Sequence, residues 1–131
     1  MIIKKNIISF VKNQKRKGKE MAAEKQFENK IKRFLESVGV YPLGTPDDKM
    51  RISPVGYYEK RHGSAFTKSG LPDMHVCIYG SSIEVEIKAE KGRVSELQKF
   101  MIQQINKSGG NAVVVRPSDF GVFCDMIKDY L

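Results

Sequence analysis

Apolar residues recur at intervals of three and four in three stretches of the chain, which is the spacing of a helix with one buried face. The stretches cover residues 22–38, the segment between a capping Ser95 and Gly109-Gly110, and residues 118–131. We therefore predict three helices. Their apolar positions are Phe27, Ile31, Phe34, Leu35, Val38, Leu97, Phe100, Met101, Ile105, Phe123, Met126, Ile127 and Leu131.

Strands are predicted where Val and Ile gather in short runs. Residues 73–79 and 82–89 form two such runs around Gly80-Ser81, which is the composition of a tight hairpin. The continuous apolar run 112–115 is typical of a strand that is covered on both faces. Seven Gly and Pro residues within 40–70 permit only short strands between loops. The order of elements predicts an α/β sandwich with a mixed sheet.

A length of 131 residues indicates one domain. Charged residues are distributed unevenly along the chain. Residues 1–20 hold seven basic side chains and one acidic one, which is +6 of the total of +8. We interpret this stretch as a flexible basic extension that suits a polyanion, and residues 21–131 as the folded domain. A solvated tail, or an upstream stretch before a start at Met21, are the alternatives.

The cysteines and the first residues indicate a cytoplasmic protein. Cys77 and Cys124 have no further partner and no metal-binding spacing, so we expect buried reduced thiols. No run of about 18 apolar residues is present. The apolar residues near the start are interrupted by Lys4, Lys5 and Asn6, so no export signal is predicted.

Three charged residues of the predicted hairpin can share one face of the sheet. With a two-residue turn at Gly80-Ser81, His75 lies opposite Glu86 and Asp73 opposite Lys88, whereas a three-residue turn would place Asp73 on the other face. Two carboxylates at diagonal positions can bind one hard cation such as Mg²⁺. A neighbouring lysine can orient a water molecule and stabilise charge on phosphorus. A solvated sheet face has the same pattern.

The context of these residues is more specific. Gly70-Leu71-Pro72-Asp73, then twelve residues, then Glu86-Ile87-Lys88 resembles the signature of the PD-(D/E)xK nucleases. With the first helix, the run 91–98 and Gly109-Gly110, residues 22–117 resemble the virus-type replication-repair nuclease (VRR-NUC) domain in its short stand-alone phage and bacterial form. The resemblance implies a restriction-endonuclease-like core, with a central mixed β-sheet flanked by helices.

The resemblance also implies roles for individual residues. Asp73, Glu86 and the backbone carbonyl of Ile87 would bind Mg²⁺ or Mn²⁺, Lys88 would position the attacking water, and Gln98 would brace the site.

One further carboxylate would come from the first helix. Glu24 and Glu28 both lie near its apolar stripe, and either could face inward. The spacing to the helix-ending glycine in the family that the chain resembles implies Glu28 as the catalytic residue and as a further candidate metal ligand.

These features predict a metal-dependent DNA endonuclease that hydrolyses phosphodiester bonds. The resemblance implies branched DNA, either four-way junctions or flaps, as the substrate in DNA repair, and a homodimer in a bacterial cell or a phage-infected host. A nuclease for simple duplex ends and a catalytically silent nucleic-acid-binding module are the alternatives. We expect DNA contacts from Lys60, Arg61, Lys68, Lys91 and Arg93, and a dimer surface from Tyr41, Tyr57, Tyr58, Phe66 and the last helix.

Overall fold

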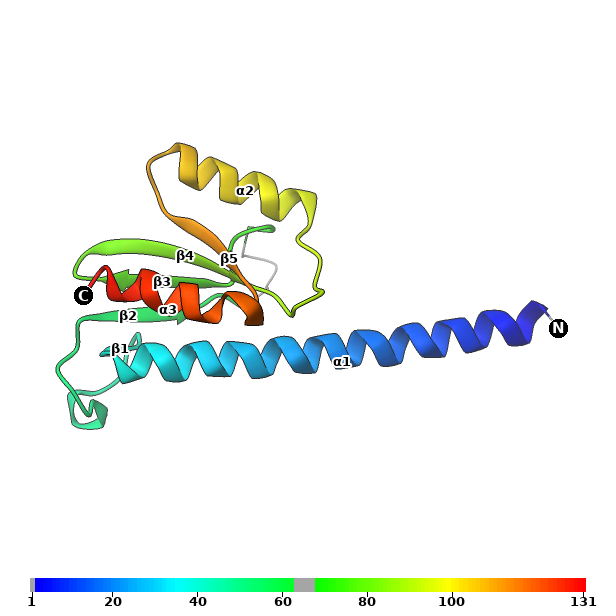
Figure 1. The fold of residues 1–131 in the computed structure, drawn as a ribbon, viewed down its shortest axis with the longest axis horizontal. Helices are drawn as coiled ribbons and strands as arrows, with labels where there is room; N and C mark the ends of the chain where they lie inside the picture. Colours follow the sequence, from blue (N-terminus) through cyan, green and yellow to red (C-terminus); the bar gives the residue numbers. More distant parts are fainter. Residues whose placement is uncertain (1, 63–67) are drawn as a thin grey trace.

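A five-stranded mixed sheet with helices on both sides forms the protein, as described for residues 2–62 and 68–131 of a computed structural model (Figure 1). The strands are ordered β1-β2-β3-β4-β5; the two outer pairs are parallel and the two inner pairs antiparallel. This architecture confirms the predicted α/β class and agrees with a restriction-endonuclease-like core. The elements are α1 (Ile2–Ser37), β1 (Val40–Pro42), η1 (Asp47–Lys49), β2 (Gly56–Lys60), β3 (Met74–Ile78), β4 (Ser81–Ile87), α2 (Glu96–Lys107), β5 (Ala112–Val115), η2 (Pro117–Asp119) and α3 (Phe120–Lys128).

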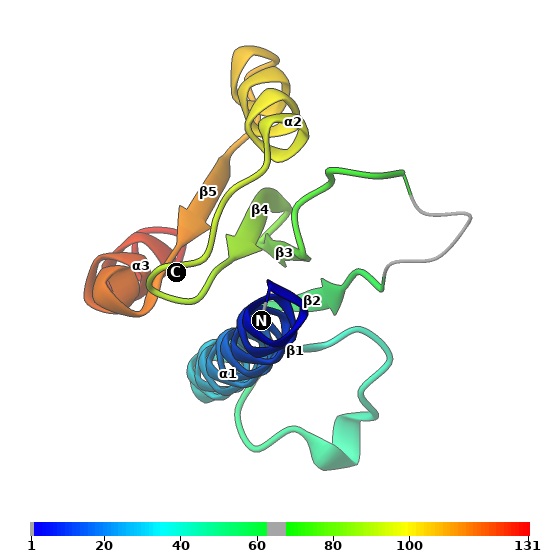
Figure 2. The same cartoon turned by 90° about the vertical axis from the view of Figure 1, so that its right-hand side faces the viewer.

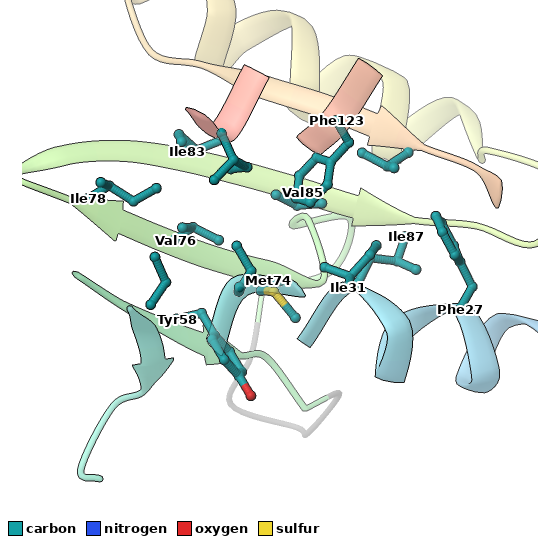
Figure 3. Close-up of a cluster of buried hydrophobic side chains, with 14 residues drawn as sticks. Phe27, Ile31, Tyr58, Met74, Val76, Ile78, Ile83, Val85, Ile87 and Phe123 are labelled. Atoms are coloured by element: carbon teal, nitrogen blue, oxygen red, sulfur yellow. The ribbon is translucent and has the colours of Figure 1, made fainter. Parts of the chain in front are cut away.

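The core lies between one face of the sheet and the helices α1 and α3 (Figure 3). Phe27 and Phe34 of α1 make edge-to-face contacts with Phe120 at the start of α3. Alternate residues of β3 and β4 are fully buried against these helices, as expected for a pleated strand. α2 lies apart from α1 and α3, beside β5 (Figure 2). The opposite face of the sheet therefore remains partly open.

The first helix begins at Ile2, and the predicted start at residue 22 is wrong. Its 36 residues make a helix about 54 Å long, and the N-terminal half extends past the sheet (Figure 1). Every residue from 4 to 20 is exposed. The predicted start marks the point where the helix gains a buried face, since Phe27 is the first buried residue on it. Within the described residues, no helix is apolar over enough of its length to span a membrane.

The hairpin has two turn residues, but they are Tyr79 and Gly80, and the predicted register is wrong by two residues. Both residues have positive φ angles, 47° and 85°, as a type I′ turn requires. The prediction missed this turn because tyrosine rarely adopts the left-handed conformation. His75 therefore lies opposite Glu84, and not opposite Glu86. A shift of two leaves every side chain on its predicted face.

The helix α2 and the strand β5 lie at their predicted positions. Ser95 caps α2 in a capping box with Gln98. On the same helix, Leu97 and Phe100 are about half exposed, contrary to the predicted buried stripe.

Three smaller expectations are wrong. Ser118 lies in η2, a 3-10 turn that precedes α3. Both cysteines are free but only partly buried. Tyr41 and Tyr58 are buried, so neither supplies a dimer surface. The Tyr41 hydroxyl accepts from the backbone N–H groups of residues 51 and 52. Phe66 lies outside the described residues.

Candidate active site

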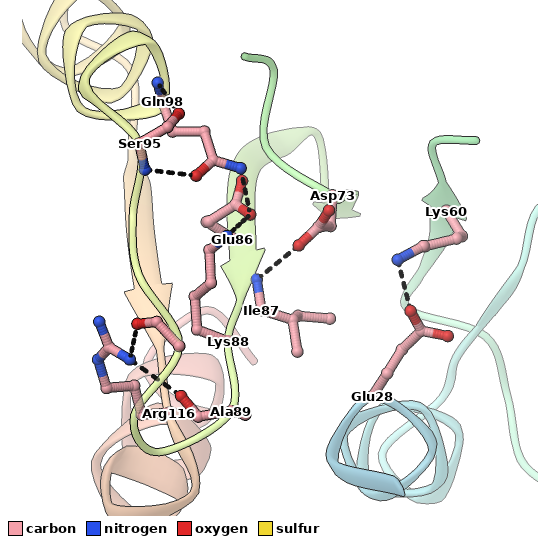
Figure 4. A network of polar contacts seen from close by, with 11 residues as sticks. Glu28, Lys60, Asp73, Glu86, Ile87, Lys88, Ala89, Ser95, Gln98 and Arg116 are labelled. Atoms are coloured by element: carbon pink, nitrogen blue, oxygen red, sulfur yellow. Dashed lines mark hydrogen bonds and ion pairs between the residues drawn. The ribbon is translucent and has the colours of Figure 1, made fainter. Parts of the chain in front are cut away.

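Asp73 and Glu86 meet on the open face of the sheet, where β3 begins and β4 ends (Figure 4). Asp73 directly precedes β3, and its Oδ2 accepts a hydrogen bond of 2.9 Å from the backbone N–H of Ile87. This bond ties the Asp73 carboxylate to the strand that carries Glu86. Ile87 itself points into the core on the other face. The alternation of β4 therefore places Glu86 and Lys88 beside Asp73, as the sequence predicts.

Gln98 fixes one oxygen of Glu86. The capping box holds Gln98, because its Oε1 accepts from the Ser95 N–H at 2.9 Å. Its Nε2 then donates to Glu86 Oε1 at 3.2 Å. The other oxygen, Oε2, is buried without a hydrogen-bond partner in the described part of the chain. A buried carboxylate oxygen without a donor is unfavourable, so this atom calls for a cation or a proton.

The electrostatics of Glu86 point the same way. Only 1% of the residue is exposed, and its burial, followed by its interaction with the Asp73 carboxylate, raises the pKa of its carboxyl group. A hard divalent cation relieves such repulsion between two carboxylates. Two carboxylates with a nearby backbone carbonyl suit Mg²⁺ or Mn²⁺, which retain several water ligands. Within residues 2–62 and 68–131, no three acidic, imidazole or thiol side chains gather into a metal-binding group.

Lys88 lies next to this pair. Its Nζ is 3.7 Å from Glu86 Oε1, and its side chain is 14% exposed. Arg116, directly after β5, stabilises the loop that follows Lys88: its Nη1 donates to the carbonyls of Ala89 at 2.9 Å and Gly92 at 2.6 Å. The sequence analysis missed Arg116, since no motif marks it; its only signal is a basic residue directly after a buried strand.

A pocket of about 280 Å³ lies beside Lys88 and is lined partly by residues of α1. Glu24 and Lys17 line it on the helix side, and Gly92 and Arg93 on the loop side. Burial, followed by the negative charge of Asp73, raises the pKa of Glu24. Glu24 is therefore the carboxylate of the first helix that the structure brings toward Asp73 and Lys88.

Glu28 occupies a different environment. It is buried, and its carboxylate pairs with Lys25 at 2.8 Å, with Lys32 at 3.1 Å and with Lys60 of β2 (Figure 4). Burial alone would raise the pKa of Glu28, but these hydrogen bonds outweigh it and lower the pKa to about 2. Glu28 thus joins α1 to the sheet through Lys60 and pairs with Lys25 and Lys32 of its own helix, contacts that differ from those that the resemblance implies.

The candidate DNA-binding side chains fall into two groups. Lys68, Lys91 and Arg93 are exposed. Lys60 and Arg61 pair instead with Glu28 and with Glu84. Less than 30% of each of these two side chains is exposed, so carboxylates of the protein already compensate both charges.

Comparison with known proteins identifies one family. The model of the VRR-NUC domain matches residues 64–119, which include β3, β4, α2 and β5. The matched segment holds Asp73, Glu86, Lys88 and Gln98, but not α1. No curated protein and no solved structure matches the chain. Over this segment the chain is similar to the VRR-NUC domain, and its mixed sheet flanked by helices is consistent with the fold of that nuclease superfamily.

Proposed function

We propose that the protein is a divalent-metal-dependent DNA endonuclease whose cation is held by Asp73, Glu86 and the carbonyl of Ile87. The observation that carries the proposal is the buried Oε2 of Glu86, which has no hydrogen-bond partner among the described residues and lies near a second carboxylate. A catalytically silent DNA-binding module would have no use for this pair, because uncompensated carboxylates repel phosphate. When bound, Mg²⁺ or Mn²⁺ would polarise the phosphate and lower the pKa of a bound water.

The protein's own groups prepare the site for this chemistry. The N–H of Ile87 orients Asp73, and Gln98 fixes one oxygen of Glu86, which leaves the other oxygen for the cation. Lys88 is the residue that positions the water and stabilises negative charge on the phosphate. Its low exposure and its contact with Glu86 keep its Nζ at the site before substrate arrives.

The substrate proposal is branched DNA, cleaved by a homodimer. The described surface supports DNA with the exposed Lys91 and Arg93 next to the pocket of Lys88. Two active sites related by a two-fold axis suit a substrate with two equivalent strands.

The test is cleavage of a panel of end-labelled four-way junction, flap, duplex and single-stranded DNA, with Mg²⁺ and with a chelator. We expect Mg²⁺-dependent internal cuts, most rapid in the branched substrates, and none with Asp73→Asn. Binding without cleavage at every metal concentration would support the silent module. Equal rates on plain duplex ends would contradict the preference for branches.

A further inference from the structure

A polar network that the proposed chemistry does not use lies beside Asp73 on the open face. Glu84 is opposite His75 in the β3–β4 pair, and its Oε1 lies 2.6 Å from Nδ1 of His75. Its Oε2 pairs with Nη1 of Arg61, which directly follows β2. The three side chains are between 14% and 28% exposed. Glu84 is thus bound on both oxygens, in contrast to Glu86.

Arg61 connects this network to the backbone of Asp73. Its Nη1 also donates to the carbonyl of Pro72 at 2.9 Å, and its backbone N–H donates to the carbonyl of Asp73 at 2.7 Å. These two carbonyls belong to the peptide groups on either side of the Asp73 Cα atom. Arg61 therefore fixes both peptide groups that determine where the Asp73 carboxylate points.

We propose that Arg61 is a positioning residue for Asp73, held by Glu84 and His75, and not a contact for a DNA phosphate. This inference rests on the proposed function, because it assigns Arg61 to the same cation site. Glu84 already compensates the charge of Arg61, which leaves little attraction for phosphate. Groups that orient metal ligands in this way commonly change metal affinity or activity 10–100-fold when they are removed, by order of magnitude.

The test compares Arg61→Gln with Arg51→Gln, which removes one exposed arginine from a loop outside the site. In Arg61→Gln we expect Mn²⁺ affinity and kcat to fall by about 10–100-fold. We expect DNA affinity, measured with a chelator, to stay within about twofold of the control. The amide of Ile87 donates to Asp73 Oδ2, so its hydrogen exchange, read by NMR, should become faster.

Glu84→Gln is the second variant, in case Arg61→Gln does not fold. Glutamine has nearly the shape of glutamate, and Arg61 stays in place in this variant. We expect smaller losses of Mn²⁺ affinity and kcat, and a smaller increase in the exchange of the Ile87 amide, than in Arg61→Gln. Normal Mn²⁺ affinity, normal kcat and an unchanged Ile87 amide, together with a loss of about one unit of salt slope in DNA binding, would overturn the proposal. The amide reports on Asp73 even in a protein that cleaves nothing. If the wild-type protein cleaves no DNA, the proposed nuclease function is rejected. Faster exchange of the Ile87 amide in the variants would still support the role of Arg61 in positioning Asp73.

Discussion

The charge of Asp73 raises the pKa of the Glu86 carboxyl group, and the repulsion of the two carboxylates without a cation should be visible in single substitutions. We predict that Asp73→Asn and Glu86→Gln each abolish cleavage, while DNA binding stays equal or becomes tighter, because one negative charge is removed from the proposed phosphate-binding site. Cleavage assays and fluorescence anisotropy on the same labelled junction measure both effects. Turnover similar to the wild type in both variants would refute the assignment of the site.

Lys88 provides a separate test, because it lies beside the carboxylate pair and is not among the proposed metal ligands. Lys88→Ala should leave Mn²⁺ affinity largely unchanged and lower kcat by about 10²-fold or more, the scale of a group that transfers a proton or stabilises charge. Single-turnover kinetics at saturating metal are the measurement. Reduced metal affinity with a normal rate at saturation would show that Lys88 has a structural role.

Glu28 predicts a pH dependence of stability. Its pKa is lowered to about 2 from an ordinary 4.5, so it stabilises the fold fully above about pH 4.5 and loses that contribution as the pH falls toward 2. Glu28→Gln should lower the free energy of unfolding at pH 7 by about 1–3 kcal/mol. Between about pH 4.5 and pH 2, the free energy of unfolding of this variant should depend less on pH than that of the wild type.

Urea unfolding at pH 7 and pH 3 measures the effect of Glu28→Gln, and Glu20→Gln, an exposed position on the same helix, is the control. Equal pH dependence in Glu28→Gln and the wild type would contradict the role of the three lysines.

At the scale of elements, local sequence determines most of what the structure shows. The helix cap at Ser95 and the strand 112–115 follow from residue type alone. The sheet face on which Asp73, Glu86 and Lys88 lie follows from the alternation of side chains along a strand. An error of two residues in the register does not change that face. What the sequence does not reveal depends on tertiary contacts: the ion pairs of Lys60 and Arg61, the direction of Glu24, and the contacts of Arg116.

The N-terminal half of α1 is predicted to contribute to DNA binding. Deleting residues 1–20 removes a net charge of +6 from an exposed stretch of helix. We expect weaker DNA binding and a log-log salt slope lower by up to about five units, at roughly 0.9 per phosphate neutralised. The fold and the metal requirement should remain.

Anisotropy titrations at several salt concentrations test the role of residues 1–20. The double variant Ile7→Gln, Phe10→Gln is the control, since it alters exposed apolar residues and keeps the charge. An unchanged slope after the deletion would exclude this segment from the DNA interface.

For the whole molecule, the proposed homodimer needs a surface other than Tyr41 and Tyr58. Exposed apolar side chains remain on all three α-helices, among them Phe10 of α1, Leu97 and Phe100 of α2 and Val122 of α3. Sedimentation equilibrium at micromolar concentration should give about twice the chain mass of 14.9 kDa. A mass near that of one chain, with full cleavage of junctions, would refute the dimer.

In the proposed function, Asp73 and Glu86 together bind a divalent cation. Titration of the metal-free protein with Mn²⁺, followed by calorimetry and by the electron paramagnetic resonance signal of free Mn²⁺, tests it without relying on catalysis. We predict binding to the wild type that weakens by at least about tenfold in Asp73→Asn and in Glu86→Gln. Equal Mn²⁺ affinity in the wild type and both variants would contradict the claim.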